Sequence, residues 1–400
     1  MWNTRNSNGT LAPPTIFPAG ERQLGAPGGR EIEVLVVDDS AVTRQVIAAV
    51  LSQEPGLNVS VAFDPIIAMD KMKRNRPDVI LLDLEMPRMD GLTFLRKIMA
   101  EDPIPVVICS ALAAAGSDAA LHAMSDGAVD IITKPAVGVK EFLYESAVLL
   151  VDAVRSAARA RVRRRGLPPA SSDPTRSGDA VLPGREAPAL RFTTDKVVLV
   201  GASTGGTEAI EQFLKPMPPD APAIVIVQHM PELFTASFSQ RLNSACQIEV
   251  KEAAHGDRVL QGRALIAPGN RHTLLQRSGG HYIVEIREGP LVSRHRPSVN
   301  VLFSSAAKAA GPNAIGVIMT GMGDDGATGL LEMKKAGAWT VAQDEASSVV
   351  FGMPKEAIAL GAVDEVSPLS RLSSTILDRF RFSANSRGET AASDRLNPNS

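Results

Sequence analysis

Residues 34–39 read Val-Leu-Val-Val-Asp-Asp, and residues 79–83 read Val-Ile-Leu-Leu-Asp. Both are apolar runs of strand length that end in carboxylates, and similar apolar runs lie at 59–63, 106–109 and 129–132. Helix-like segments separate the five runs. Continuously apolar strands that alternate with helices are typical of a parallel sheet covered on both faces. The first third of the chain is therefore predicted to be a doubly wound α/β domain with a five-stranded parallel sheet.

The reactive residues of this domain follow the ends of four of its predicted strands. Asp38 and Asp39 follow the first strand, Asp83 the third, Ser110 the fourth and Lys134 the fifth. Because the carboxyl ends of parallel strands meet at one sheet edge, we expect these side chains to lie together. Three carboxylates suit a hard divalent ion such as Mg²⁺, while a hydroxyl and an ammonium suit the oxygens of an acyl phosphate. A strand-end Asp is also a common helix cap. The predicted phosphate-accepting site therefore rests on all five residues occurring together at the ends of four strands.

A second α/β block begins at Lys196. Its predicted strands lie at 197–200, 223–227, 248–251, 264–266, 314–319, 339–342 and 362–363. A hairpin is predicted over 271–286, because Ser278-Gly279-Gly280 favours a tight turn. This block is predicted to be a second α/β domain built on a parallel sheet.

The second block carries a serine, a histidine and an acidic residue at predicted strand ends. Ser203 lies in a small-residue turn from strand to helix, where free backbone N–H groups can stabilise an oxyanion. A serine hydroxyl needs a base, and His229 ends the next apolar strand. Asp324 and Asp325 both follow the strand at 314–319, and spacing alone does not choose which of them orients the imidazole. The Gly-rich loop around Met322 is expected to supply further N–H donors.

A dinucleotide-binding loop is the interpretation that competes with a serine hydrolase at Ser203. Gly-x-x-x-Gly-Gly after a strand weakly resembles a dinucleotide loop. Such a site favours an acidic residue at the end of the next strand, where Gln228 and His229 stand. The Ser-His-Asp order along the chain also differs from the Ser-Asp-His order of the α/β-hydrolases. The remaining histidines are expected to be structural: His122, His255, His272, His281 and His295.

Composition narrows the class of protein further. A net charge of −2 over 400 residues gives no general reason to expect binding to nucleic acid or to an anionic membrane. No run approaches the roughly 20 apolar residues that span a bilayer, and the polar N-terminus lacks the apolar core of a secretory signal. Cys109 and Cys246 lie far apart in the sequence, which suits a reducing compartment, and neither has the CxxC partner that a thiolate zinc site would need. These features predict a cytoplasmic protein without membrane insertion.

Changes in composition along the chain predict its domain boundaries. Arginines at 159, 161, 163, 164 and 165 lead into a stretch rich in Pro, Ser and Gly. Such a basic run can contact nucleic acid, but no nucleic-acid-binding module follows it, and a helix end followed by a tether is favoured. The predicted units are a disordered extension (1–30), a first domain (31–153), a flexible basic and Pro-rich linker (154–192), a second domain (193–382) and a disordered tail (383–400).

The first domain resembles a response-regulator receiver. The resemblance covers about residues 32–150 and rests on Val-Val-Asp-Asp-Ser, Leu-Leu-Asp-Leu-Glu-Met-Pro with a following Asp-Gly, and Thr-Lys-Pro. It implies phosphorylation of Asp83 by a histidine kinase, with Mg²⁺ bound nearby. The residues it assigns to the metal are Asp38, Asp39 and Asp83, and those it assigns to the switch are Ser110 and Lys134. Receivers often carry Tyr or Phe three residues before the lysine, where this chain departs from the pattern with Ile131.

The second domain is similar to the catalytic domain of chemotaxis protein-glutamate methylesterases. The similarity runs from about 195 to 380 through Gly-Ala-Ser-Thr-Gly-Gly, Gln-His-Met-Pro, Ala-Pro-Gly-Asn-Arg-His, Arg-Pro-Ser-Val-Asn and Met-Thr-Gly-Met-Gly-Asp-Asp-Gly. The residues that it assigns are the triad Ser203, His229 and Asp325, with Thr204 and Met322 at the oxyanion site or the substrate cleft. Asp324 falls beside the triad, and Asn300 stands where the family pattern leads us to expect Asp.

Together the two resemblances imply a phosphorylation-regulated hydrolase for sensory adaptation. It would demethylate glutamyl γ-methyl esters on the cytoplasmic domains of chemoreceptors, deamidate receptor glutamines, and use no cofactor for the ester chemistry. The unphosphorylated receiver would shield the catalytic cleft. The main alternative is a phosphorylated, non-catalytic signalling adaptor whose C-terminal domain only binds partners. A second alternative keeps the hydrolase but places it in a receptor-coupled process other than swimming.

Overall fold

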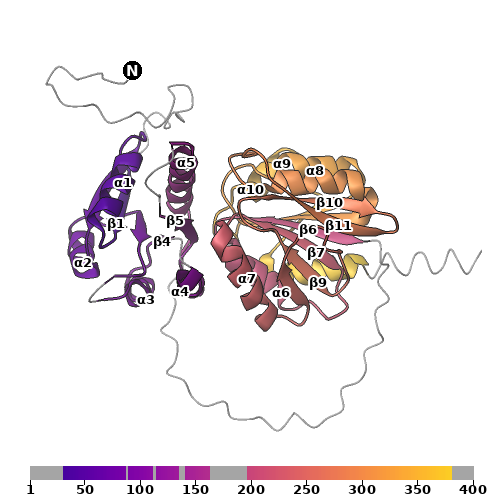
Figure 1. Cartoon of the computed structure of the whole chain (residues 1–400), viewed down its shortest axis with the longest axis horizontal. Coiled ribbons are helices and arrows are strands. Elements are labelled where there is room, and N and C mark those ends of the chain that lie inside the picture. The colour runs from indigo at the N-terminus through magenta and orange to yellow at the C-terminus, as the bar shows by residue number, and fades with distance from the viewer. Residues whose placement is uncertain (1–29, 87–88, 111–113, 135–139, 163–195, 381–400) are drawn as a thin grey trace, which may run out of the picture.

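The computed structural model of the chain describes residues 30–86, 89–110, 114–134, 140–162 and 196–380. They form two α/β domains that face each other, the first indigo to purple and the second rose to yellow in Figure 1. Nearly all of the predicted extension, the predicted linker beyond 162 and the predicted tail lie outside the described residues. Within those residues, no helix combines the length and the apolar character that crossing a bilayer requires.

The first domain is a five-stranded parallel sheet, as predicted, and its strands lie in the order β2-β1-β3-β4-β5. Its elements are β1 (Ile32–Val37), α1 (Ala41–Leu51), β2 (Leu57–Ala62), α2 (Pro65–Arg74), β3 (Val79–Leu82), α3 (Gly91–Glu101), β4 (Val106–Ser110), α4 (Ala114–Ser125), β5 (Asp130–Thr133) and α5 (Lys140–Ala157). The register sets Val34 of β1 between Val59 of β2 and Val79 of β3. The carboxyl ends of β1 and β3, which precede the predicted acidic residues, are therefore neighbours.

Polar caps start the helices of this domain. Ser40 caps α1 by accepting a hydrogen bond from Thr43, and Asp90 caps α3 in the same way at 2.8 Å. Each cap satisfies a backbone N–H that the first turn leaves unpaired. The helix-capping interpretation of the strand-end acids therefore does not apply to Asp38 or Asp83, because other residues fill the caps.

The second domain is a seven-stranded parallel sheet in the order β14-β13-β12-β6-β7-β9-β8. Its elements are β6 (Val197–Ala202), α6 (Gly206–Leu214), β7 (Ala223–Gln228), α7 (Glu232–Ala245), β8 (Glu249–Glu252), β9 (Arg263–Ile266), β10 (His272–Ser278), β11 (His281–Arg287), α8 (Val299–Ala309), the 3₁₀ turn η1 (Gly311–Asn313), β12 (Ala314–Ile318), α9 (Ala327–Lys335), β13 (Trp339–Gln343), α10 (Met353–Ala359), β14 (Glu365–Ser367) and a last helix over 369–380. Strands β10 and β11 form the predicted antiparallel hairpin. Strands β12, β6 and β7 are adjacent and completely buried, so the loops that follow them meet at one edge.

The strand predicted at 362–363 is wrong, because these residues end a helix instead. Gly361 has a φ of +74° and donates to Ile358 O, while Ala362 donates to Ala357 O. This pair of bonds is the Schellman arrangement that closes a helix C-terminus. The last strand of the sheet, β14, begins at Glu365.

Helix α5 runs to Ala157, four residues beyond the domain edge that composition suggested at 153. Its last turns continue the apolar stripe that faces the sheet: Val154 and Ala157 are completely buried. Beyond the helix, Arg161 pairs with Glu345 of the second domain at 2.7 Å. The end of α5 thus belongs both to the first core and to the contact between the domains.

Helix α4 packs against α6 and α7 of the second domain. Arg241 of α7 donates to the backbone oxygen of Leu121 at 3.1 Å, contacts the Ser125 hydroxyl, and pairs with Glu211 of α6 at 2.7 Å. A cation is stabilising at a helix C-terminus, where carbonyls lack partners. Arg241 therefore links the end of α4 in the first domain to α6 and α7 in the second.

Both cysteines are free thiols. Cys109 is buried in β4, and burial raises the pKa of its thiol to about 12. A thiol with so high a pKa is not a nucleophile near neutral pH. Cys246 follows α7, where burial also raises the pKa of its thiol.

Candidate active site

The loop that carries Ser203 is fixed by its backbone. Ser203 N–H donates to Thr320 O at 2.9 Å, and its own carbonyl accepts from Gly206 N–H at 2.7 Å. Gly205 has a φ of +76°, which a side chain would strain, and a Cβ on Gly206 would lie 2.0 Å from Gln228 Oε1. The two glycines are therefore required for the sharp turn from β6 into α6 that presents the serine.

His229 and Asp325 lie in direct contact. His229 Nε2 is 2.8 Å from Asp325 Oδ2. His229 follows β7, whose neighbour β6 leads to Ser203, and both residues line one pocket of about 280 Å³. The other ring nitrogen of His229, Nδ1, is buried and has no hydrogen-bond partner among the described residues. The structure thus brings the three residues together with one imidazole nitrogen uncommitted.

Asp325 sits at the N-terminus of helix α8. It accepts hydrogen bonds from the Ser298 hydroxyl at 2.8 Å and from the backbone N–H groups of Val299 at 2.7 Å and Asn300 at 3.0 Å. Burial alone would raise the pKa of this carboxyl, but the hydrogen bond and charge of His229 outweigh it, so the pKa lies below its usual range. Asp325 is therefore an ionised acceptor, and the proton on His229 belongs on Nε2.

Burial separates Asp324 from Asp325 and favours Asp325 as the partner of the imidazole. Asp325 is 1% exposed and faces His229, whereas the neighbouring Asp324 is exposed to solvent. Spacing in the sequence did not separate these two carboxylates.

His295 was expected to be structural, but it lies against the candidate base. Its ring stacks on His229 with centroids 3.7 Å apart and planes 14° apart. Burial, together with the nearby charge of His229, holds the pKa of His295 well below its ordinary value. A neutral ring stacked on His229 restricts the rotation of that imidazole. The Arg-His-Arg-Pro stretch over 294–297, directly before the cap of α8, was the sequence feature that could have pointed to it.

Asn300 is a structural centre of the loop beside Asp325. Its side-chain oxygen accepts from Thr328 Oγ1 and from Gly329 N–H, both at 2.8 Å, and its amide nitrogen donates to Ser293 Oγ at 3.0 Å. An Asp at this position could not donate to Ser293. Only the backbone of Asn300 contacts Asp325, so the departure from the expected Asp leaves the His229–Asp325 pair intact.

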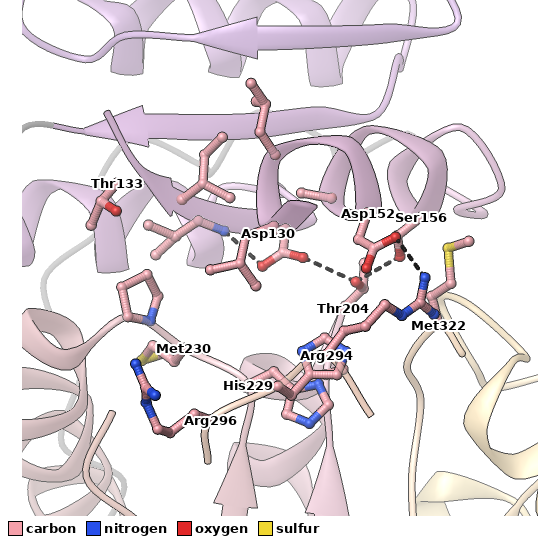
Figure 2. Close-up of a pocket in the computed structure, with 18 of the residues that line it drawn as sticks. Asp130, Thr133, Asp152, Ser156, Thr204, His229, Met230, Arg294, Arg296 and Met322 are labelled. Atoms are coloured by element: carbon pink, nitrogen blue, oxygen red, sulfur yellow. Dashed lines mark hydrogen bonds and ion pairs between the residues drawn. The ribbon is translucent and has the colours of Figure 1, made fainter. Parts of the chain in front are cut away.

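Thr204 and Met322 both line the pocket, but the Thr204 hydroxyl faces the first domain. Thr204 Oγ1 accepts from Ser156 Oγ of α5 at 2.7 Å and donates to Asp130 Oδ2 of β5 at 3.0 Å (Figure 2). The next residue, Gly205, donates its N–H to Val129 O of the first domain at 3.1 Å. The first domain therefore contacts the backbone of the loop that carries Ser203 and forms one wall of the pocket.

The carboxylates at the edge of the first sheet converge. Asp38, Asp39 and Asp83 offer oxygens within 4.8 Å of one another. Lys134 Nζ lies 2.6 Å from Asp83 Oδ2 and 2.9 Å from Asp38 Oδ2. Burial raises the pKa of Asp83, although the Lys134 ammonium opposes this shift. Two buried carboxylates beside an exposed one form an oxygen donor set that fits a hard divalent cation reached from solvent.

Ser110 ends β4 next to this cluster. The side chain is buried, and its carbonyl accepts the backbone N–H of Lys134 at 2.8 Å. Ile131, at the position where receivers often carry an aromatic residue, is 4% exposed and forms part of the pocket wall. Strand β5 thus joins Lys134, beside the carboxylate cluster, to Asp130, which contacts the second domain.

Comparisons with known proteins match both domains. Residues 34–142 match the response regulator receiver domain and residues 198–376 match the CheB methylesterase family. The chain is 60% identical over 352 residues to protein-glutamate methylesterase/protein-glutamine glutaminase 5 of Anaeromyxobacter dehalogenans (strain 2CP-C), covering 87% of this chain and 96% of that relative. It is 58% identical to protein-glutamate methylesterase/protein-glutamine glutaminase 3 of Geobacter metallireducens (strain ATCC 53774 / DSM 7210 / GS-15), covering 87% of this chain and 99% of the relative.

Two solved structures correspond to the separate domains. The Thermotoga maritima CheB methylesterase catalytic domain is 36% identical, with a TM-score of 0.46. The alignment covers 46% of this chain and 99% of that domain's chain. The response regulator domain of Thermotoga maritima CheB is also 36% identical, with a TM-score of 0.30, and covers 33% of this chain and 99% of its own. Because family models match both domains and the relatives align over almost their whole length, the chain belongs to the family of protein-glutamate methylesterases/protein-glutamine glutaminases that joins a response-regulator receiver to a CheB methylesterase domain.

Proposed function

We propose that this chain hydrolyses glutamyl γ-methyl esters on the cytoplasmic segments of chemoreceptors, deamidates glutamines there, and is switched by phosphorylation of Asp83. The observation that carries the proposal is the 2.8 Å contact between His229 Nε2 and the ionised Asp325, in the pocket that Ser203 also lines. A serine, an imidazole and a carboxylate in this relation are the parts of a serine hydrolase.

Ester cleavage begins at Ser203. Its Oγ attacks the ester carbonyl carbon, while His229 Nδ1, which has no other partner among the described residues, takes the hydroxyl proton. Asp325 holds the Nε2–H tautomer and stabilises the imidazolium that forms. Backbone N–H groups of the loops that carry Thr204 and Met322 are the proposed donors to the oxyanion.

The intermediate then collapses, and the C–O bond to the methoxy group breaks. His229 returns its proton to the leaving oxygen, so methanol departs and the glutamyl group stays as an ester on Ser203. A water molecule, deprotonated by His229, attacks this acyl-enzyme and releases a glutamate carboxylate. When the substrate is glutamine, ammonia leaves in place of methanol. Each step uses a group of the chain or water.

The receiver supplies the switch in this proposal. Asp83 accepts a phosphoryl group from a histidine kinase, and the three carboxylates Asp38, Asp39 and Asp83 are the proposed Mg²⁺ ligands. When bound, the ion neutralises phosphoryl oxygens during transfer. Lys134 pairs with Asp83 before transfer and is positioned to pair with the added phosphoryl charge afterwards.

The pocket wall contributed by the receiver supports a covered resting state. Asp130 and Ser156 contact Thr204, and Asp152 pairs with Arg294, all beside His229 (Figure 2). A receptor helix cannot reach Ser203 while these contacts stand. Phosphorylation at one end of β5 would then act on the docking residues at its other end.

The test is methanol release from methylated chemoreceptor fragments, with and without acetyl phosphate and Mg²⁺. We expect release that rises with the phosphodonor in the wild-type chain and is absent in Ser203→Ala, which should keep its fold because the serine side chain is small. Phosphorylation without methanol release would contradict the proposal and favour the signalling adaptor.

A further inference from the structure

Arg294 is the cation of the pocket that the proposed mechanism leaves without a task. It lines the same cavity as Ser203 and His229, and its side chain is 40% exposed. Among the described residues its guanidinium has one hydrogen-bond partner, Asp152 of the receiver, at 3.2 Å. Within its own domain it donates to no described residue, so departure of the receiver leaves the five guanidinium N–H donors facing the cleft.

The neighbouring Arg296 differs in this respect. It donates to Asn270 Oδ1 at 2.7 and 2.9 Å and to Gly289 O at 2.7 Å, all within the catalytic domain. These bonds anchor Arg296 to the wall whether or not the receiver is docked. Arg294 is therefore the guanidinium whose partner changes when the cleft is uncovered.

The backbone at Arg294 adopts a strained conformation. Val292 and His295 exchange backbone hydrogen bonds at 3.1 and 2.9 Å, and the two residues between them, Ser293 and Arg294, have φ angles of +48° and +67°. Positive φ at both central positions is the pattern of a type I′ turn, which strongly favours Asn and Gly. An arginine here is strained relative to glycine, and residues kept in such conformations cluster at functional sites.

The Asp152 contact shows what chemistry the guanidinium accepts. Only one oxygen of Asp152 is bonded, and its Oδ2 has no hydrogen-bond partner among the described residues. A single contact at 3.2 Å is weaker than the two-point pairing that arginine and a free carboxylate prefer. Asp152 is thus a carboxylate that fills the site in the covered state and that a better-placed carboxylate can replace.

We propose that Arg294 is a specificity-determining residue that binds an acidic side chain of the substrate segment beside the scissile glutamyl group, and that Asp152 occupies this position when the receiver covers the cleft. The inference rests on the proposed function and adds the class of substrate: a segment with a carboxylate near the ester. The product of each turnover is itself a carboxylate, so a segment with several modified sites gains affinity as it is demethylated.

Two peptides of equal length test this proposal on the full-length chain with acetyl phosphate and Mg²⁺. Both carry a central glutamic acid γ-methyl ester, flanked one helical turn away on each side by Glu in the acidic peptide and by Gln in the neutral one. We expect kcat/KM to favour the acidic peptide about tenfold through KM, the size of one charge-assisted hydrogen bond in a partly exposed site. Arg294→Gly should make kcat/KM equal for the two peptides.

Arg294→Gly also separates recognition from structure. Glycine suits a positive φ, so the catalytic domain should melt at the same temperature or higher while the preference is lost. Arg287→Gln, which removes an arginine on β11 that pairs with Glu285, is the matched control and should keep the preference. A preference for the acidic peptide that survives Arg294→Gly, or that Arg287→Gln also removes, overturns the assignment.

Binding of both peptides to Ser203→Ala keeps this test apart from the proposed function. If the wild-type chain releases methanol from neither peptide, the proposed hydrolysis fails, while the binding comparison still reports on Arg294. Tighter binding of the acidic peptide that disappears in Ser203→Ala/Arg294→Gly supports the recognition role. Equal binding of the two peptides by Ser203→Ala overturns it. Without phosphodonor, Asp152→Asn should raise affinity for the acidic peptide more than for the neutral one.

Discussion

Asp325 is the residue on which the catalytic geometry depends most, because it joins His229 to the N-terminus of α8. Asp325→Asn keeps the shape but removes the charge that fixes the Nε2–H tautomer and stabilises the imidazolium. We expect kcat for methanol release to fall by about 10³-fold or more, as for the loss of a triad carboxylate elsewhere. Steady-state kinetics with acetyl phosphate present will measure this.

The adjacent carboxylate provides the control for this substitution. Asp324 is exposed and does not contact His229. Asp324→Asn makes the same chemical change one residue away and should leave kcat unchanged. A comparable loss in both variants would mean that loop conformation, and not the charge of Asp325, sets the rate.

The positions of the proposed catalytic residues at strand ends could be predicted from the sequence, whereas the residues that pack around them could not. Ser203 and His229 follow apolar strands, and strand ends of a parallel sheet must meet. His295 and Arg294 follow no strand. Their positions depend on a tight turn with two positive φ angles, formed by Ser and Arg where Asn or Gly would have signalled it.

At the scale of elements, the cap of helix α8 has two roles: it stabilises the first turn of the helix, and it holds Asp325 in place. The Ser298 hydroxyl accepts from Val301 N–H at 3.4 Å and donates to Asp325 at 2.8 Å. Ser298→Ala should destabilise the domain by about 1–2 kcal/mol, the usual effect of losing a cap and a buried hydrogen bond. It should also lower kcat several-fold with KM unchanged, because Asp325 loses one of its donors. Thermal melting and kinetics on the same preparation measure both effects.

Ser305, two turns further along α8, separates the two effects. Its hydroxyl accepts from Leu275 N–H at 2.8 Å and lies in the same helix, without contact to Asp325. Ser305→Ala should reduce stability but leave kcat at the wild-type value. If kcat fell in proportion to the loss of stability in both Ser298→Ala and Ser305→Ala, the cap would have no specific effect on Asp325.

Most elements were predictable because continuous apolar runs such as 197–200 form buried parallel strands. The error at 362–363 arose because two small apolar residues can end a helix as well as start a strand. What separates the two outcomes is Gly361 in the left-handed region, followed by a buried Ala362 that closes the cap. A short apolar run carries no periodicity to distinguish them.

At the scale of the whole molecule, the receiver should govern the rate through one carboxylate. Asp83→Asn keeps the size of the side chain but cannot accept a phosphoryl group as an acyl phosphate. We expect unstimulated methanol release to remain and stimulation by acetyl phosphate to disappear. The comparison is the ratio of rates with and without the donor.

Asp70→Asn is a suitable control for the receiver variant. Asp70 is an exposed residue of α2, a helix on the side of the receiver away from the second domain (Figure 1), and among the described residues it pairs with Lys73 at 3.5 Å. It should retain full stimulation. Stimulation of Asp83→Asn to the wild-type level would show that the donor acts at another site.

The docked state should also respond to pH through Asp130. Burial raises the pKa of this carboxyl to about 6, above its ordinary value, when it packs against Thr204. The docked form therefore binds a proton more tightly than the released form, where Asp130 returns to a pKa near 4. Its stabilising contribution is complete below about pH 4 and is lost as the pH rises through about 6.

The measurable result is the ratio of stimulated to unstimulated rate. In the wild-type chain this ratio should fall between pH 5.5 and 7.5, because unstimulated activity grows as the docked form weakens. Asp130→Asn, which stays neutral, should reduce the trend. It should not abolish it, since burial also raises the pKa of Asp152 in the same interface. A ratio with the same pH dependence in both chains would rule out Asp130 as the titrating group.

The docking of the two domains was the part of the structure least accessible from the sequence. Periodicity and strand ends describe each sheet separately. The contacts between the sheets, such as Thr204 with Asp130 and Arg241 with Leu121, are side-chain matches between segments more than 70 residues apart. No local pattern encodes them, so the sequence predicts two domains without their relative placement.

The bond from Gly205 to Val129 makes the two modules less interchangeable than their separate folds suggest. The receiver contacts the same turn that carries Ser203, and the side-chain bonds of Thr204 with Asp130 and Ser156 make the fit specific to this pair of domains. A receiver grafted from another regulator, with its phosphorylation chemistry intact, would leave the enzyme permanently on unless it also reproduced the acidic start of the fifth strand. Chimaeras that restore only an Asp at the position of Asp130 would show whether this one substitution lets a foreign receiver lower the unstimulated rate.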